Sequence, residues 1–322
     1  MDVEVSAIKD ALSGSKSEDL ITNDSQRRDI GSFSPDNTIR KFVLTDAVVS
    51  SGVDIDGLTF GNAIRFEHES LLSLREKYAE NIEVQERVNK QRESGNRGAI
   101  LFNEGLTYGA QAALASTLMM FESGVFQKRH ELLVNYDFNE LMLHGGTVLP
   151  PIINLYSGEK TVEDRLMKKV SARYTLTQQA KFVTKPPTIL DYLSFEKYPV
   201  KEPSPISIPY TQNEITHWAQ GVIKGWKLGD RQAYGLIDSA IAKLDRDRLG
   251  MLRFHEMRKH SMVSDIKVSK MQSSVSGTST ELVVGESQLM LTQLPKFILS
   301  GEDWTPIQKL DELEYKHLIN NK

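Results

Sequence analysis

The stretch that decides the fold is residues 211–261, TQNEITHWAQGVIKGWKLGDRQAYGLIDSAIAKLDRDRLGMLRFHEMRKHS. It contains no proline, so it predicts one long helix, or two helices with a break near Gly250. Small residues recur in it at every fourth position, at Gly221, Gly225, Gly229 and Ala233. Because a glycine costs about 0.5–1 kcal/mol relative to alanine inside a helix, we expect this stripe to form a groove in which another backbone packs closely.

The glycine stripe also resembles the small-residue seams that join transmembrane helices. Charged residues interrupt it, at Lys224, Lys227, Asp230 and Arg231, so a soluble, close-packed helix is the better interpretation. Three large residues lie on an adjoining face and are expected to anchor the helix: Trp218, Val222 and Trp226.

Two further helices are expected before this one. Residues 99–121 are rich in alanine and other apolar residues, which predicts a buried helix suited to close packing. Residues 62–93 contain no glycine or proline, and Ile64, Leu71 and Leu74 belong to an apolar series at helical spacing. The rest of that segment carries charges of alternating sign, which favours a single charged helix on its own domain over a seam for a partner helix.

The hydrophobic period changes to two in residues 170–183 and 265–292, which predicts strands. Apolar residues alternate on either side of Gly285-Glu286-Ser287, so we expect a hairpin with its turn there. The predicted fold class is therefore α+β, with a small, mostly antiparallel β-sheet or sandwich that is built from both segments and surrounded by long α-helices. Four prolines in residues 197–210 predict an extended, polyproline-like connector with few hydrogen bonds.

Residues 1–57 are predicted to form an extended, partly disordered N-terminal arm. They are rich in serine, aspartate and asparagine, and they offer too little apolar surface to offset the entropy of ordering. Residues 58–96 hold the charged helix, residues 97–306 the α+β domain, and residues 307–322 a charged tail with helical potential. We expect the arm and exposed aromatic side chains to contact partners.

The composition of the 322-residue chain excludes several classes of function. Lys and Arg number 39 against 43 Asp and Glu, a net charge of −4 that argues against a nucleic-acid-binding surface. Cysteine is absent, which removes disulfides, zinc–thiolate centres, iron–sulfur clusters and cysteine nucleophiles. No apolar run approaches the ~18 residues that span a bilayer, and Met1–Glu4 lacks the basic start of an export signal.

The most suggestive catalytic pattern is His255-Glu256-Met257-Arg258-Lys259-His260, which resembles the zinc-binding helix of metalloproteases. Its two histidines are five residues apart. That spacing puts them about 140° apart around a helix, so they point to different faces and cannot both reach one metal. A metal-dependent hydrolase that uses His255, Glu256 and His260 is therefore kept only as an alternative.

Other short patterns are better explained by ordinary structure. Asp54-Ile55-Asp56-Gly57 lacks the later ligands of a calcium loop and predicts a turn. Gly221–Lys227 lacks the spacing of a phosphate loop. Asp245-Arg246-Asp247-Arg248 is typical of a solvated or self-paired helix surface. The sequence thus predicts no catalytic, cofactor-binding or metal-binding residues, and it favours a binding or scaffold role over an enzyme.

A series of short motifs carries a family resemblance. In order they are GLTYGAQ at 105–111, YDFN at 136–139, VLPP at 148–151, QAKFVT at 179–184, PP at 186–187, DYL at 191–193, Trp218, GWxxG at 225–229, QA at 232–233, RD at 246–247, GM at 250–251, HSMVS at 260–264 and WTP at 304–306. Through them the chain resembles the DotC/TraI family of type IVB secretion and conjugation systems, from Arg97 to Pro306. Several motifs in the right order are far more specific than any one of them.

The resemblance implies a periplasmic lipoprotein in the outer-membrane core complex of a machine that moves DNA or effector proteins. It implies ring packing with copies of itself and with DotD-like and DotH-like subunits, and it implies no catalysis and no cofactor. A DNA-contacting conjugation factor is a further alternative.

Two departures from the family pattern affect these expectations. The family's export signal ends at a lipidated cysteine, which this chain lacks. Either the region that carries it has been replaced, or partner subunits hold the protein at the inner leaflet of the outer membrane. Residues 1–96 have no counterpart in the family pattern.

Overall fold

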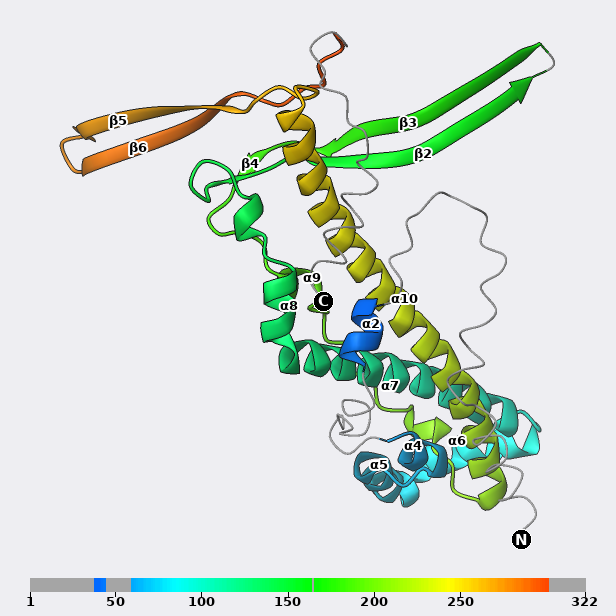
Figure 1. Cartoon of the computed structure of the whole chain (residues 1–322). Helices are drawn as coiled ribbons and strands as arrows, with labels where there is room; N and C mark the ends of the chain where they lie inside the picture. Colours follow the sequence, from blue (N-terminus) through cyan, green and yellow to red (C-terminus); the bar gives the residue numbers. More distant parts are fainter. Residues whose placement is uncertain (1–37, 45–58, 164, 301–322) are drawn as a thin grey trace. The chain divides into compact units, whose positions relative to one another are not determined.

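The computed structural model describes residues 38–44, 59–163 and 165–300 (Figure 1). Among these, residues 156–173 belong to one compact unit, and the others belong to a second, largely helical unit. Four features named above lie outside the described residues: the rest of the predicted arm, the pattern at 54–57, the motif at 304–306 and the predicted tail at 307–322.

Helices and strands alternate in groups along the chain. The helices are α2 (Thr38–Val43), α4 (Phe60–Arg65), α5 (Glu69–Ala79), α6 (Ile82–Glu93), α7 (Arg97–Gln127), α8 (Arg129–Asn135), α9 (Ile189–Tyr192) and α10 (Gln212–Lys259), with short 3₁₀ turns η1 (Asn139–Leu141) and η2 (Pro205–Ser207). The strands are β1 (Val148–Leu149), β2 (Ile152–Glu163), β3 (Leu166–Gln178), β4 (Lys181–Phe182), β5 (Lys267–Gly277) and β6 (Leu282–Gln293).

Helix α10 has 48 residues and continues through Gly250 without a break. The Thr211 side chain caps its first turn by accepting a hydrogen bond from the Glu214 backbone N–H at 3.3 Å. Helix α7 has 31 residues, and its alanine-rich face is enclosed, as predicted. Of the two alternatives for residues 211–261, the single long helix is correct.

The glycine stripe of α10 packs directly on the backbone of α7, which confirms the predicted groove. A Cβ atom added at Gly225 would lie 2.0 Å from the carbonyl oxygen of Leu106, and one added at Gly221 would lie 2.1 Å from that of Phe102. Five glycines form this contact, which we call the glycine seam: Gly105 and Gly109 from α7, and Gly221, Gly225 and Gly229 from α10. Only residues without a side chain allow such an approach, so close packing offsets the low helix propensity of glycine.

The single charged helix predicted for residues 62–93 is wrong. The segment forms three helices, α4, α5 and α6, which are separated by turns at Phe66 and before Asn81. Phe66 ends α4 in the left-handed conformation, with φ 58°, and its ring is buried against that of Trp218. Asn81 begins α6 by accepting a hydrogen bond from the Val84 N–H at 3.1 Å. Local capping and the burial of Phe66 thus outweigh an uninterrupted helical pattern.

Trp218 anchors these helices inside the chain. Its side chain is fully buried, and its Nε1–H donates a hydrogen bond to the Ala63 carbonyl oxygen at 2.8 Å. Val222 is also fully buried, and the ring of Trp226 lies 5.1 Å from that of Phe60, centroid to centroid. The three predicted anchors are confirmed, and they hold parts of the same chain together.

Part of the predicted N-terminal arm is helical and packs on the core. Ile39 and Val43 of α2 are only 7% and 0% exposed. The Arg40 Nη1 atom donates to both carboxylate oxygens of Asp238 in α10, each at 3.0 Å. The prediction of an extended arm is therefore wrong for residues 38–43, because their apolar side chains complete a core formed mainly by α7 and α10.

The connector between α9 and α10 is largely extended, as predicted, but it is well hydrogen-bonded. Within residues 197–210, the backbone N–H groups of Lys201 and Ser204 donate to the α7 side chains of Gln111 and Glu104, and just before this segment the Phe195 N–H donates to Glu122. The expectation of few hydrogen bonds is wrong because the backbone pairs with side chains of a neighbouring helix instead of with another strand.

The α+β class and the antiparallel strands are confirmed, but the strands do not share one sheet. The described strands form three two-stranded ladders, β1–β4, β2–β3 and β5–β6. The predicted turn at Gly285-Glu286-Ser287 is wrong, because β6 continues through these residues and pairs with β5. The turn lies between the two strands, where the Thr278 N–H donates to the Glu281 carbonyl oxygen at 2.8 Å. Gly285 has a positive φ of 74° within β6.

Candidate functional site

Several of the motifs that carry the resemblance meet on the C-terminal half of α10. The Tyr136 hydroxyl donates to the Asp245 carboxylate at 3.2 Å, and the Tyr192 hydroxyl donates to the Asp247 carboxylate at 3.3 Å. The ring of Phe138 stacks on that of Tyr192, with centroids 5.7 Å apart and planes 12° apart. Two tyrosine–aspartate pairs thus fasten the segment between α7 and α10 to α10, and we call these four residues the tyrosine lock.

The electrostatics of the tyrosine lock differ from those of a solvated helix surface. Asp247 pairs with Arg246 at 2.8 Å, as predicted for a self-paired cluster, but Asp247 is only 5% exposed. Burial raises the pKa of Asp245, although the hydrogen bond from Tyr136 opposes that rise. Burial and the neighbouring carboxylates raise the pKa of Tyr136 and of Tyr192 well above the usual value. Both tyrosines therefore stay protonated and serve as hydrogen-bond donors at neutral pH.

Removing the Tyr192 hydroxyl is expected to weaken the lock. Tyr192→Phe keeps the ring stack with Phe138 but removes a hydrogen bond to the buried Asp247, so we expect the free energy of unfolding to fall by about 1.5 kcal/mol. Urea unfolding measures the change. Tyr198→Phe is the control, because Tyr198 is 39% exposed and its substitution is expected to change stability by less than about 0.5 kcal/mol. Equal losses for the two variants would contradict a stabilising role for the lock.

A second contact places the start of β2 on α10. A Cβ atom added at Gly250 would lie 2.4 Å from the Ile152 Cγ2 atom and 3.1 Å from the Ile153 backbone nitrogen. The nearby Arg253, which is 9% exposed, donates to the Ile153 carbonyl oxygen at 3.3 Å. Gly250 thus permits the chain that follows β1 to approach the helix, and it does not break the helix.

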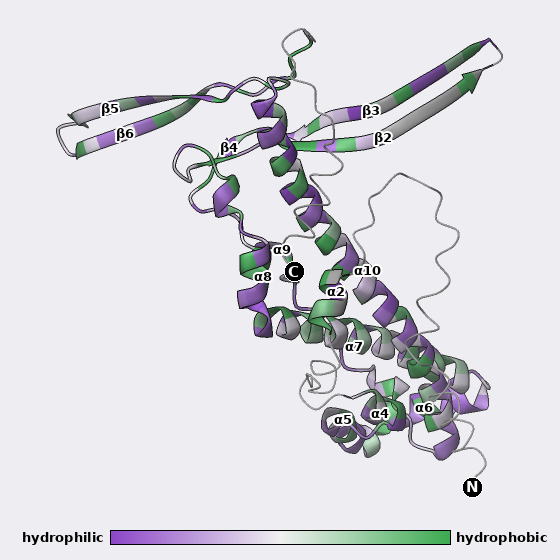
Figure 2. Ribbon diagram, viewed as in Figure 1, coloured by the Kyte–Doolittle hydropathy of each residue, from purple (hydrophilic) through white to green (hydrophobic). Residues whose placement is uncertain are grey.

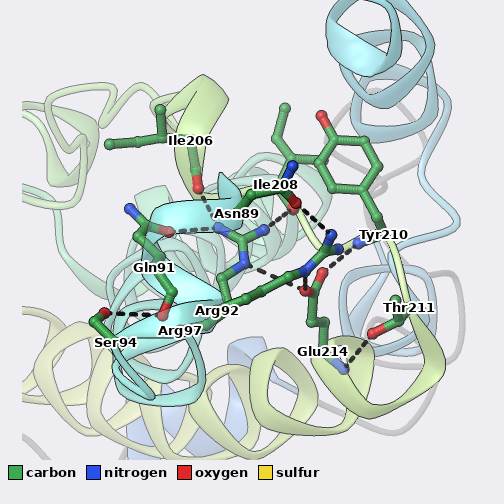
Figure 3. A network of polar contacts seen from close by, with 10 residues as sticks. All are labelled: Asn89, Gln91, Arg92, Ser94, Arg97, Ile206, Ile208, Tyr210, Thr211 and Glu214. Atoms are coloured by element: carbon green, nitrogen blue, oxygen red, sulfur yellow. Dashed lines mark hydrogen bonds and ion pairs between the residues drawn. The ribbon is translucent and has the colours of Figure 1, made fainter. Parts of the chain in front are cut away.

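A buried ion-pair network joins the start of α10 to α6, α7 and the connector (Figure 3). Glu214 is 6% exposed; it accepts a hydrogen bond from Arg92 at 2.8 Å and lies 3.4 Å from the Arg97 Nε atom. Arg97 is 5% exposed and also donates to the carbonyl oxygens of Ile206 and Ile208 in the connector. One buried carboxylate therefore pairs with two arginines, the buried Arg97 and the partly exposed Arg92, at a point where four segments meet.

The two arginines keep Glu214 ionised. Burial alone would raise the pKa of Glu214, but hydrogen bonds from Arg92 and from the Tyr210 backbone N–H, together with the charge of Arg97, lower it below its usual value. This network could not be predicted from the sequence, because Arg92 and Arg97 lie far from Glu214 along the chain. The Thr-x-x-Glu spacing at 211–214 is the one local signal, since it is typical of a helix N-terminus.

The histidines at 255 and 260 do not assemble a metal centre with Glu256. The Nε2 atom of His255 lies 2.7 Å from the Leu141 carbonyl oxygen, and that of His260 lies 3.3 Å from Glu256. Burial lowers the pKa of His255, so its neutral ring can donate to the Leu141 carbonyl. No group of three or more His, Cys, Asp or Glu side chains suited to a metal ion occurs in the part of the chain that the structure describes.

The most exposed apolar side chains of the β5–β6 hairpin lie on one face, although Val283 and Leu289 on the other face are also exposed, at 37% and 43%. Its cross-strand pairs Ser269–Met290, Met271–Gln288, Ser273–Glu286 and Val275–Val284 follow one another at every second residue, so they share a face. The apolar members of this face, with Leu282 beside them, are 59–72% exposed: Met271, Val275, Leu282, Val284 and Met290. Figure 2 shows the hydrophobic stretches of β6 on either side of a hydrophilic one. Clustered exposed apolar side chains are typical of protein-interaction surfaces.

The sequence comparisons identify the family. A profile of the TraI family, described as type IV secretory system, conjugal DNA–protein transfer, matches residues 95–306. The search of curated proteins gives no match. The matched region includes the glycine seam, the tyrosine lock and the β5–β6 hairpin. Across the described ranges, none of the helices is both long and apolar enough to cross a bilayer. The chain belongs to the TraI family of type IV secretory systems for conjugal DNA–protein transfer.

Proposed function

We propose that the chain is a structural subunit of the outer-membrane core complex of a type IVB secretion or conjugation system, where it supports assembly of the translocation channel. The observation that carries the proposal is the family match over residues 95–306. The family match concerns type IV secretion as a whole, and the DotC-like motifs support the more specific place within it.

The geometry of the described residues supports an assembly role. The glycine seam and the tyrosine lock fix the two long helices and the segment between them. The buried carboxylates of Asp247 and Glu214 are each paired with arginine, an arrangement that suits support of a fold better than proton transfer. We therefore expect no enzymatic activity.

The proposal includes a location and a set of partners. We expect the protein in the periplasm, at the inner leaflet of the outer membrane, held there by a lipid anchor or by its partners. The expected partners are DotD-like and DotH-like subunits and further copies of the chain. The net charge of −4 is more consistent with a structural subunit of the translocation channel than with a surface that binds DNA.

Isolation of the native complex tests this proposal. An epitope-tagged chain, produced in cells that carry the system, is expected in the outer-membrane fraction together with DotD-like and DotH-like subunits. Deletion of its gene is expected to abolish transfer of DNA or effector proteins, and the wild-type gene supplied in trans should restore it. Recovery of the tagged chain only as a free cytosolic monomer would overturn the proposal.

A further inference from the structure

We infer that the β5–β6 hairpin of one copy docks, head to tail, on the corner between α7 and α8 of a second copy. The inference deepens the proposed function, on which it rests for the contact between copies, and it is argued from two surfaces of this chain. The first surface, the hairpin face, comprises Met271, Val275, Leu282, Val284 and Met290 with Glu286 among them. The second surface, the corner patch, comprises Phe126, Arg129, Leu133 and Val134.

The hairpin face has the properties of a surface that is covered in an assembly. A two-stranded hairpin is marginally stable in water unless its apolar face packs on something. Here Val275 and Val284 lie directly opposite each other and are 59% and 70% exposed. Met271 and Met290 form a second apolar group on the same face, and Glu286 lies between the two groups along β6.

The corner patch offers the matching chemistry. Phe126 is 61% exposed, and the Arg129 guanidinium lies 4.3 Å from the centroid of its ring. Leu133 follows Arg129 by one turn on the same face of α8 and is 38% exposed, and Val134 beside it is 78% exposed. The patch is therefore a positive charge with an aromatic ring and aliphatic side chains around it.

The two surfaces complement each other better than either complements itself. Two hairpin faces related by a two-fold axis through their centres would bring the Glu286 carboxylates together, and two corner patches would do the same with Arg129. Docking of the hairpin face on the corner patch instead places Glu286 opposite Arg129. It also places the methionines of the hairpin face against the Phe126 ring, which is a favourable sulfur–aromatic contact. Because this contact joins different surfaces, it is heterologous, and repetition builds a ring or a filament.

A lipid surface is a poorer occupant for the hairpin face. Within residues 267–293 the two lysines are balanced by two glutamates, so the hairpin has no excess positive charge to attract anionic headgroups. Insertion would also bury the charge of Glu286 in an apolar medium. A protein surface that carries a cation fits the face better.

Disulfide cross-linking between purified copies tests the inference, because the 322 residues contain no cysteine. Full-length Val284→Cys and Leu133→Cys proteins, one of them enlarged by a tag, are mixed under mild oxidation. Only contact between copies can join them. Random pairing of the two proteins sets the statistical yield of the mixed disulfide. We expect the observed ratio of mixed disulfide to the two homodimers to exceed that statistical ratio by about threefold or more. Ser287→Cys is the matched control, since Ser287 is exposed on the opposite face of β6, and its mixture with Leu133→Cys should show no such preference.

Charge reversal supplies a second measurement. Adding Glu286→Arg to the first protein, or Arg129→Glu to the second, should lower the mixed yield about threefold, and using both together should restore it. Circular dichroism checks that each variant is folded, and Val275→Cys replaces Val284→Cys if that variant is not. A statistical distribution, dominant homodimers, or equal linking through Ser287→Cys would overturn the inference while leaving the proposed function untouched.

Discussion

Gly225→Ala is expected to lower the free energy of unfolding by about 3 kcal/mol, the upper range for overpacking a rigid site. The new Cβ atom would lie 2.0 Å from the Leu106 carbonyl oxygen and 2.8 Å from the carbon of the same carbonyl. These atoms belong to the backbone of α7, so no side-chain rotation relieves the overlap, and the two helices must separate along the glycine seam. Urea unfolding followed by far-ultraviolet circular dichroism measures the loss.

Gly235→Ala is the matched control for the seam. Gly235 lies in the same helix, but a Cβ atom added there meets nothing within 4 Å. Alanine is therefore expected to stabilise the protein at this position by about 0.5–1 kcal/mol through helix propensity alone. If Gly225→Ala were as stabilising as Gly235→Ala, backbone contact would not be the reason for glycine in the seam.

Glu214→Gln is expected to cost a similar amount, about 3 kcal/mol, because it leaves Arg97 buried without its counter-charge. Arg97 and Glu214 are 5% and 6% exposed, so water cannot replace the lost carboxylate. The control is Glu67→Gln. Glu67 lies 3.8 Å from Arg65, and both side chains are more than half exposed, so its loss should cost less than about 1 kcal/mol. A small effect at both positions would contradict the importance of the buried network.

The effect of Glu214→Gln is also expected to depend on pH. The pKa of Glu214 is lower in the folded protein than its usual value, so its ionisation stabilises the fold. This contribution is fully present above the pKa of the unfolded chain and is lost as the pH falls through the folded pKa. The stability difference between wild type and variant should therefore be largest at neutral pH and shrink in acid. Unfolding curves at a series of pH values measure it, and a difference that stays constant would point to packing instead of charge.

Features encoded locally could be predicted from the sequence. A single proline-free stretch with glycine at every fourth position was sufficient to predict helical structure over residues 211–261 and the close approach of another backbone at Gly221 and Gly225, but it left open a break near Gly250. The alanine-rich helix α7 and the α+β class followed from periodicity in the same way. The prediction failed in residues 62–93, where the burial of the Phe66 ring against Trp218 helps to end a helix that the local pattern would continue.

The features that bear on function also divide into those encoded locally and those that depend on tertiary contacts. The order of short motifs was enough to indicate a type IV secretion family, because each motif is a local string of residues. How the motifs meet could not be predicted: Tyr136 and Tyr192 reach Asp245 and Asp247 only because the chain folds back on α10. Arg97 and Glu214 likewise become partners through tertiary contact.

By itself, the sequence determined the long helices, their glycine seam and the family, since period, residue size and motif order are properties of neighbouring residues. Only the tertiary structure decided which carboxylates are buried and paired, which strands form ladders, and which apolar face of the β5–β6 hairpin stays exposed. The physical reason is that burial and charge pairing depend on contacts between segments far apart in the chain. A local sequence pattern does not specify those contacts.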